Sequence, residues 1–500
     1  MALPLPVLVG AGQVTDRPAD PRAGLEPLAL MEAAARAALA DAGPAAALRD
    51  AVDTVAVVTN VFHDYLDTAS MLAARLGCRP GRRLLSTWGG NTPISLLAHC
   101  CDEIAAGRSA IALIAGGEAF HTMRALGKAG IPSPWTPPAD TPAPRWGDTR
   151  QGTSDLEARH GAREATVTYA LVENAYRAAR GLSLDAHRAE LGAYAARCTR
   201  VAAENPHAWF PVARDAAALT AVTPVNRMVA FPYPKRLNAI LEVNQGAALL
   251  VASEEAARRL GVARSGMVYP RAGVDVAEHW FLTERENYHT LPGLRRAGAA
   301  LLAAADTSLD AIAHLDLYSC FPIAARLTAD MLGLAPDADR PLTVTGGLPW
   351  FGGAGNDYAT HALAAMRARL LADGGGLGLV HALGWNLTKH ALVVLGTTPA
   401  PYGWTRVASA PLQARIDARP RPALAPEADG RATVEAYTVV HGRDGGPERG
   451  VVIGRLHDQR RFIAELPCDT GLLADLERAE GVGVAGTVRC DRGHNVFAPA

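Results

Sequence analysis

The side chains in this sequence that are able to act as nucleophiles or metal ligands include seven cysteines and 15 histidines. Residues 99–101, His-Cys-Cys, bring three of them together. Successive residues of a helix point about 100° apart, so three in a row cannot converge on one ion. Cys468 and Cys490, with His457 and His494, are widely spaced and form no Cys-x-x-Cys pair. We therefore expect no metal site, and free thiols in a reducing compartment, the cytoplasm.

Backbone N–H groups offer a second kind of chemistry, the binding of a carbonyl or an anion. Thr92 and Pro93 suit the N-cap and the first position of a helix over 92–106, whose free N–H groups can hold such a ligand. The glycine pairs at 346–347 and 352–353 lack the spacing of a dinucleotide fingerprint. They indicate instead a backbone that approaches a ligand closely.

Strand-like and helix-like runs alternate in residues 1–120. Because parallel strands need helical crossovers, this order predicts a parallel sheet covered by helices on both faces. Strands are expected at 7–14, 53–60, 84–88 and 110–116, and helices at 27–42, 68–76 and 92–106.

Residues 121–235 interrupt this order. The stretch 131–145 holds six prolines, which exclude regular structure, and two helices are expected after it, at 165–180 and 184–204. A connection of this length is typical of a lid or substrate loop, and we interpret it as one.

A second alternating half occupies 236–397, so the predicted fold class is α/β with two similar halves. The Pro-, Ala- and Arg-rich segment 398–432 indicates a linker. The β-like alternation of 433–500, interrupted by a helix at 472–479, predicts a small antiparallel barrel. In the second half, helices are expected at 291–305, 322–332 and 358–372, and strands at 314–321, 342–345, 378–383 and 390–395.

The charge balance excludes two classes of partner. Lysine and arginine number 49 and aspartate and glutamate 50, so no basic excess exists to attract nucleic acid or a membrane surface. The apolar runs are too short to cross a bilayer, and the first residues lack the basic region of a signal peptide.

Five segments in order resemble the thiolase superfamily over roughly residues 5–397. The resemblance implies the thiolase fold, two βα halves layered as αβαβα, and the tail is similar to the C-terminal β-barrel added in thiolase-like proteins labelled acetyl-CoA acetyltransferase. The segments are 107–120 (strand and Gly-Gly-Glu turn), 226–253 (bridge between the halves), 315–321 (LDLYSCF, similar to the His-Asp-Cys-Phe loop of sterol-carrier-protein thiolases), 344–356 (the Gly-His-Pro loop) and 379–396 (the Cys-x-Gly-Gly-Gly end).

The resemblance also locates the catalytic positions of a thiolase, and three of them are replaced. The nucleophilic cysteine falls on Gly90, the activating histidine on Gly353 and the late cysteine on His381. The thiolate must stand at the start of a helix, whereas Cys100 lies about 15 Å further along it. We therefore expect no standard thiolase reaction.

Two residues keep other chemistry open. Cys320 matches the acid/base cysteine of the His-Asp-Cys-Phe loop, and Tyr318 replaces its histidine. A tyrosine there resembles thiolase-fold aldolases that cleave β-hydroxyacyl-CoA, a reaction that needs a base and an oxyanion site but no covalent nucleophile. With His381, these two are the candidate catalytic residues. A core thiol, a packed aromatic ring and a structural histidine are the alternative interpretations.

The resemblance implies an acyl-CoA thioester as substrate or ligand, with no bound cofactor. Three functions follow: a protein of the acyltransferase class without thiolase activity, a lyase that uses Tyr318, and a non-catalytic acyl-CoA-binding scaffold. Thiolase folds usually dimerise, and the sequence is compatible with a homodimer or a monomer. The expected contacts of the thioester are Gly90, Asn91, Thr92, Gly352, Gly353 and Asn356, and those of the coenzyme A phosphates are Lys235 and Arg236, although exposed basic pairs are usually solvated.

Overall fold

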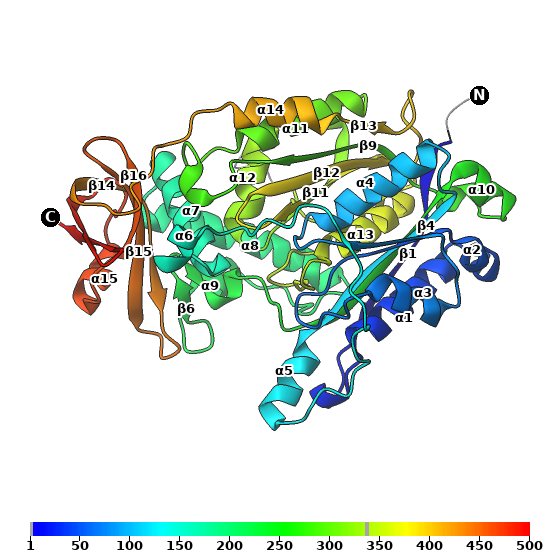
Figure 1. Ribbon diagram of the computed structural model, residues 1–500, viewed down its shortest axis with the longest axis horizontal. Coiled ribbons are helices and arrows are strands. Elements are labelled where there is room, and N and C mark those ends of the chain that lie inside the picture. Colours follow the sequence, from blue (N-terminus) through cyan, green and yellow to red (C-terminus); the bar gives the residue numbers. More distant parts are fainter. Residues whose placement is uncertain (1–3, 336–339) are drawn as a thin grey trace.

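The computed structural model describes residues 4–335 and 340–500, so the first three residues of the predicted N-terminal half lie outside it. Two β-sheets form the main body of the molecule (Figure 1). In spatial order the first contains β1 (Pro6–Thr15), β8 (Asn244–Ser253), β4 (Ile111–Ala119), β2 (Thr54–Val57), β3 (Arg82–Ser86) and β5 (Arg145–Trp146). The second contains β10 (Ile312–Leu317), β11 (Leu377–Gly384), β12 (Lys389–Gly396), β9 (Tyr269–Ala277) and β13 (Thr405–Arg406).

Helices α4 (Thr92–Ala105) and α13 (Tyr358–Ala372) lie between the two sheets (Figure 1). Both are apolar on nearly every side, as a helix packed between two sheets must be. The layers are therefore αβαβα, which confirms the predicted fold class. The outer helices are α1 (Pro27–Asp41), α2 (Ala45–Ala51), α3 (Thr68–Leu76) and α10 (Glu254–Arg259) on the first sheet, and α11 (Pro292–Ala304), α12 (Pro322–Leu332) and α14 (Ser409–Asp417) on the second.

The prediction of a parallel sheet is wrong, because both sheets are mixed. Strand β8 runs antiparallel to its neighbours β1 and β4, and β12 runs antiparallel to β11 and β9. The pairs β4–β2, β2–β3 and β3–β5 are parallel. The direction of β8 depends on where the long insertion returns to the sheet, which local alternation does not reveal.

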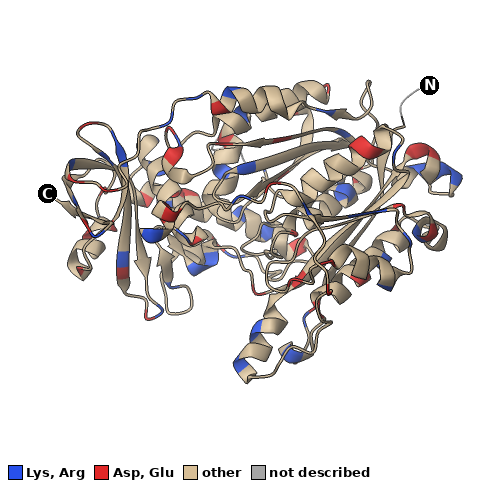
Figure 2. Ribbon diagram, in the orientation of Figure 1, with Lys and Arg blue, Asp and Glu red and all other residues tan. Residues whose placement is uncertain are grey.

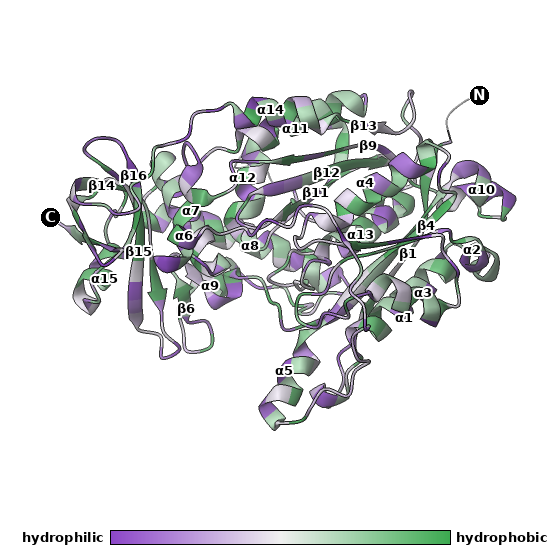
Figure 3. Ribbon diagram, viewed as in Figure 1, coloured by the Kyte–Doolittle hydropathy of each residue, from purple (hydrophilic) through white to green (hydrophobic). Residues whose placement is uncertain are grey.

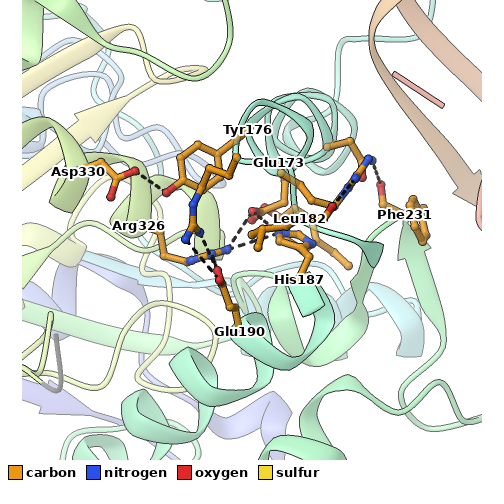
Figure 4. Close-up of polar contacts among 12 residues, drawn as sticks. Glu173, Tyr176, Leu182, His187, Glu190, Phe231, Arg326 and Asp330 are labelled. Atoms are coloured by element: carbon orange, nitrogen blue, oxygen red, sulfur yellow. Dashed lines mark hydrogen bonds and ion pairs between the residues drawn. The ribbon is translucent and has the colours of Figure 1, made fainter. Parts of the chain in front are cut away.

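The insertion between β4 and β8 is largely helical. The proline-rich stretch has no helix or strand before β5 begins at Arg145, as predicted. Figure 4 shows a buried ionic network that ties α7 and α8 to α12. Glu173 accepts hydrogen bonds from His187 Nε2 at 2.8 Å and Tyr233 Oη at 2.6 Å. The elements are α5 (Phe120–Ala129), α6 (Asp155–Arg159), α7 (Ala165–Ala179), α8 (Leu184–Glu204), α9 (Ala216–Thr220), β6 (Met228–Ala230), β7 (Tyr233–Pro234) and the short 3-10 helix η2 (Lys235–Leu237).

The C-terminal strands close into a five-stranded barrel at the end of the molecule opposite the N-terminus (Figure 1). Closure leaves the ring without a free edge. The pairing of β16 with β18 is parallel, and the other four are antiparallel. The order around the ring is β14 (Gly430–His441), β15 (Pro447–Leu456), β16 (Arg461–Glu465), β18 (His494–Pro499) and β17 (Ala485–Asp491), with α15 (Thr470–Leu476) after β16.

Two other local predictions need correction. Residues 398–432, expected as a linker, include β13 and α14, which pack against β9 and α11. Residues 342–345, expected as a strand, form bends instead. Asp316 holds them by accepting hydrogen bonds from Thr343 Oγ1 and Val344 N, both at 2.9 Å. A buried carboxylate at the end of β10 therefore replaces strand pairing here.

Charge and hydropathy follow this architecture. Residues of both signs are scattered over the molecule (Figure 2). Hydrophobic residues concentrate in the strands of the two core sheets and in the helices that cover them (Figure 3). Within residues 4–335 and 340–500, no helix combines the length and apolar character that membrane spanning requires.

Candidate functional site

The start of α4 meets the ends of β10 and β11. Leu317 at the end of β10 pairs with His381 of β11, so Tyr318 emerges beside the last residues of β11. Gly384 at the end of β11 pairs with Lys389, the first residue of β12. These registers place the strand ends against the turn that precedes α4.

Gly90 and Tyr318 are in direct contact. A Cβ atom built on Gly90 would lie 2.6 Å from Cζ of Tyr318 and closer still to its hydroxyl. It would also lie 2.7 Å from the carbonyl oxygen of Leu383. The phenol of Tyr318 thus stands where any side chain on residue 90 would begin. Burial, and then the neighbouring Cys320, raises the pKa of Tyr318, so its hydroxyl remains protonated.

Several hydrogen bonds hold the turn before α4 in place. Asn356 Oδ1 accepts from Gly89 N at 2.9 Å, and its Nδ2 donates to Thr59 O at 2.9 Å. Thr92 donates to the carbonyl of Gly89 through both its N, at 3.0 Å, and its Oγ1, at 2.8 Å. Two of the groups expected to contact a thioester, those of Asn356 and Thr92, therefore hold the turn in place.

The N-cap of α4 is Asn91 and not Thr92, which corrects the prediction by one residue. The side chain of Asn91 makes no capping hydrogen bond. Its Nδ2 is 3.3 Å from Ser95 Oγ, and its buried Oδ1 has no partner among the described residues. Asn91 thus presents a free acceptor next to the start of the helix.

Cys320 lies two residues beyond Tyr318 and is partly exposed. Burial of the thiol raises the pKa of Cys320 to about 12, and the neighbouring Tyr169 opposes this only in part. The carbonyl of Cys320 accepts from Ala239 N at 3.0 Å. At neutral pH its sulfur is therefore a thiol, which is poorly suited to nucleophilic attack.

His381 is fully buried and lies 3.0 Å, Nε2 to Nδ1, from His390 on the neighbouring strand. His390 Nε2 is 3.1 Å from the carbonyl of Leu387, which can only accept, so the proton of His390 is on Nε2. Burial, reinforced by the other ring, lowers the pKa of His381 and keeps both rings neutral. His381 therefore donates to His390, and its Nδ1 has no partner among the described residues.

The loop that matches Gly-His-Pro lies against the bridge segment between the halves. Gly353 N donates to the carbonyl of Ile240 at 2.8 Å. Gly352 has φ +124° and packs against Gln245, whose Cδ would be 2.9 Å from an added Cβ. Both glycines therefore border the same stretch of chain as Cys320, whose carbonyl binds Ala239.

Lys235 and Arg236 lie on η2, upstream of that stretch. Lys235 is exposed. Arg236 is half-buried, and its Nη1 donates to the carbonyl of Ala218 at 2.7 Å. Of this predicted pair, Arg236 is thus tied to α9 and Lys235 faces solvent.

Sequence reasoning missed two buried acids and one buried lysine. Burial raises the pKa of Glu118 to about 8 and also raises that of Asp357, and each has one carboxyl oxygen without a partner among the described residues. Lys389 is only 7% exposed. A signal existed for Lys389: it is one of three lysines in the sequence and stands at the start of an apolar strand.

Comparison with known proteins shows which proteins this chain is similar to. The profile of the "Thiolase-like protein type 1 additional C-terminal domain" matches residues 411–493. A monomeric SCP2-thiolase like protein type 1 from Mycobacterium smegmatis is 35% identical, covers 99% of both chains and superposes with a TM-score of 0.85. A comparison with the curated proteins gives no match.

Two more distant structures share the fold. An Ltp2-ChsH2(DUF35) aldolase has 18% identity over 79% of this chain and 98% of that chain, with a TM-score of 0.59. An acetyl-CoA acetyltransferase from Syntrophomonas wolfei has 13% identity over 79% of this chain and 100% of that chain, with a TM-score of 0.57.

Proposed function

The chain belongs to the family of SCP2-thiolase-like proteins of type 1, and from this premise we propose that it binds an acyl-CoA thioester without attacking it covalently. The contact between Gly90 and Tyr318 supports the proposal. A nucleophile is replaced there by a neutral hydroxyl, which can donate a hydrogen bond to a thioester carbonyl. Cys320 is the remaining thiol nearby, and its raised pKa disfavours attack.

Two measurements test this proposal. Titration calorimetry with acetyl-CoA and longer acyl-CoA thioesters should show saturable binding, and acetoacetyl-CoA with free coenzyme A should yield no thiolysis. Asn91→Ala should weaken binding about five- to tenfold, the value of one lost hydrogen bond. Tyr402→Ala, at a side chain that is 84% exposed, should leave binding unchanged. Thiolysis that is abolished by alkylating one cysteine would refute the proposal.

A second candidate function is retro-aldol cleavage of a β-hydroxyacyl-CoA. It is favoured by one observation, the protonated hydroxyl of Tyr318 at the start of α4. Such a group suits protonation of the enolate that cleavage generates. Tyr318→Phe should abolish cleavage while acyl-CoA still binds, and Tyr402→Phe should leave cleavage intact. Undiminished cleavage by the Tyr318→Phe protein would exclude this role.

We further propose that the protein is a monomer. The two residues of β5 pair with Leu85 and Ser86, so the chain itself covers this part of the outer side of β3. The M. smegmatis protein is described as monomeric. Sedimentation velocity should therefore give one species at the mass of a single 52.4 kDa chain, and a concentration-dependent dimer would contradict the proposal.

A further inference from the structure

A cavity of about 550 Å³ adjoins the first turn of α4. Its walls come from α4, the loop after β5, strand β9 and the beginning of β12. Trp146, Trp280 and Val276 give it an apolar part. Tyr318 and Cys320 are not among its lining residues, whereas Asn91 and Thr92, both expected to contact a thioester, are.

Lys389 lines this cavity and has no carboxylate partner among the described residues. Its Nζ donates to the carbonyl of Trp88 at 2.5 Å. The acids nearby are engaged by arginines: Asp148 by Arg150 and Asp275 by Arg406. A buried ammonium is costly, and burial lowers the pKa of Lys389 to about 8, with the nearby Asp148 opposing this shift only in part.

An unpartnered acceptor stands beside this amine. Asn91 lines the same cavity, and its Oδ1 is buried without a hydrogen-bond partner among the described residues. An added Cβ on Gly89 would lie 2.5 Å from Asn91 Oδ1 and 2.8 Å from Lys389 Nζ. Gly89 has φ +140°, a conformation that favours glycine, so both groups converge on a residue without a side chain.

We propose that Lys389 is a reactive amine that forms an imine with a small aldehyde or ketone bearing an aromatic or branched apolar group. The lone pair of Nζ attacks the carbonyl carbon, and one of the two protons of the amine passes to the former carbonyl oxygen to give a carbinolamine. The second proton of the nitrogen then passes to the hydroxyl, which leaves as water as the C=N bond forms. Addition of water reverses the sequence, and no oxidant or reductant is consumed.

The chain contains its own controls, because Lys128 and Lys235 are its other lysines and both are exposed. The full-length protein is treated at pH 7 with benzaldehyde and sodium cyanoborohydride, and benzylated lysines are quantified by peptide mass spectrometry. Lys389 should be labelled at least about tenfold faster than either exposed lysine, since a far larger fraction of it is free amine. Labelling no faster than Lys128 would overturn the proposal.

Two variants test whether the fast labelling of Lys389 depends on the cavity and on the amine itself. Val276→Trp narrows the cavity and should slow labelling of Lys389 at least about fivefold, with Lys128 unchanged. Unaltered labelling in this variant would also overturn the proposal. Lys389→Arg keeps a donor for the Trp88 carbonyl and should remove only the signal at residue 389, with circular dichroism confirming the fold.

The pH profile gives a further check. Labelling of Lys389 should level off above pH 8, whereas labelling of Lys128 should keep rising towards pH 10. A parallel rise for both would contradict a perturbed amine. The other charged or titratable groups that line the cavity are Asp148, Arg150, Asp275, Glu278, His279, Glu284, His390, Arg406, Asp417 and Arg421.

Discussion

At the scale of single residues, the pocket is organised by the contact between Gly90 and Tyr318. The glycine has no side chain, and the phenol ring lies in the space that one would need. A methyl group on residue 90 must push against the ring and against the backbone carbonyl of Leu383. The site is therefore intolerant of even the smallest enlargement at this position.

Gly90→Ala should lower the free energy of unfolding by about 1–3 kcal/mol, the usual cost of overpacking. Gly127→Ala is the matched control. An added Cβ at Gly127, inside α5, meets no heavy atom within 4 Å. That substitution should be neutral or stabilise by up to about 1 kcal/mol through helix propensity. Urea unfolding measures both, and equal effects would show that the Tyr318 contact is not restrictive.

Glu118 should make stability fall as pH rises. Burial raises its folded-state pKa to about 8, whereas an unfolded glutamate titrates near about 4.3. Between these values the unfolded chain binds fewer protons than the folded one, so stability is lost with increasing pH. Glu118→Gln should therefore raise the melting temperature, relative to the natural chain, more at pH 8 than at pH 5. Glu427→Gln, at an exposed residue, should show no such trend, and a pH-independent difference for Glu118→Gln would refute the assignment.

At the scale of elements, α7, α8 and α12 are joined through one carboxylate (Figure 4). Burial alone would raise the pKa of Glu173, but His187 and Arg326 outweigh it and lower that pKa, so the group is ionised. Arg326 Nη1 lies 3.1 Å from Glu173 Oε1. Removing this anion leaves Arg326 with Glu190 as its remaining carboxylate partner and leaves His187 and Tyr233 without the acceptor that they share.

Glu173→Ala should lower the free energy of unfolding by about 3–5 kcal/mol, as expected when one member of a buried ion pair is deleted. Hydrogen exchange should speed up in α7 and α8 before it does in α4. Glu255→Ala, at an exposed position of α10, should change stability by less than about 0.5 kcal/mol. Unchanged exchange in α7 and α8 would contradict this role.

The sequence predicts helices and strands correctly where the pattern of neighbouring residues determines them. Helices α12 and α13 have the expected bounds, because an apolar pattern with clear ends is a local property. The direction of β8 and the bends at 342–345 depend on partners far away in the chain, namely β1, β4 and Asp316. Such long-range contacts leave no periodic pattern in the sequence.

The candidate site likewise has some features that the sequence shows and others that depend on the fold. The absence of a cysteine at position 90 is visible in the sequence. The contact of Gly90 with Tyr318, by contrast, requires two strands and a helix to be placed together. The exposure of Lys389 to a cavity also depends on the loop after β5, which supplies part of the wall. The residue types at these positions could be taken from the sequence, whereas the contacts between them could not.

At the scale of the whole molecule, one buried arginine fastens the barrel to the core. Arg461 is fully buried. It forms an ion pair with Glu435 of strand β14, with 2.7 Å between Nε and Oε2. It also donates to the carbonyls of Thr283 at 3.1 Å and Glu286 at 3.2 Å, which belong to the core. The barrel and the thiolase-like body are therefore expected to unfold together.

Arg461→Met keeps the volume and removes these bonds, and it should cost about 3–5 kcal/mol because Glu435 keeps only Arg455 as an ion-pair partner and the two core carbonyls lose this donor. Limited proteolysis between residues 418 and 430 should accelerate, and the single unfolding transition should split into two. Arg489→Met, at an exposed position on β17, is the control and should do neither. A single transition in the Arg461→Met protein would contradict this coupling.

The contact between Gly90 and Tyr318 also limits how this site can change by descent. A cysteine that arose at position 90 would meet Tyr318 before it met a substrate, and a smaller residue at 318 would leave a void beside Gly90. Either single substitution is therefore expected to lower stability. A side chain at position 90 can be accommodated only if residue 318 changes with it, so the two positions are expected to vary as a pair.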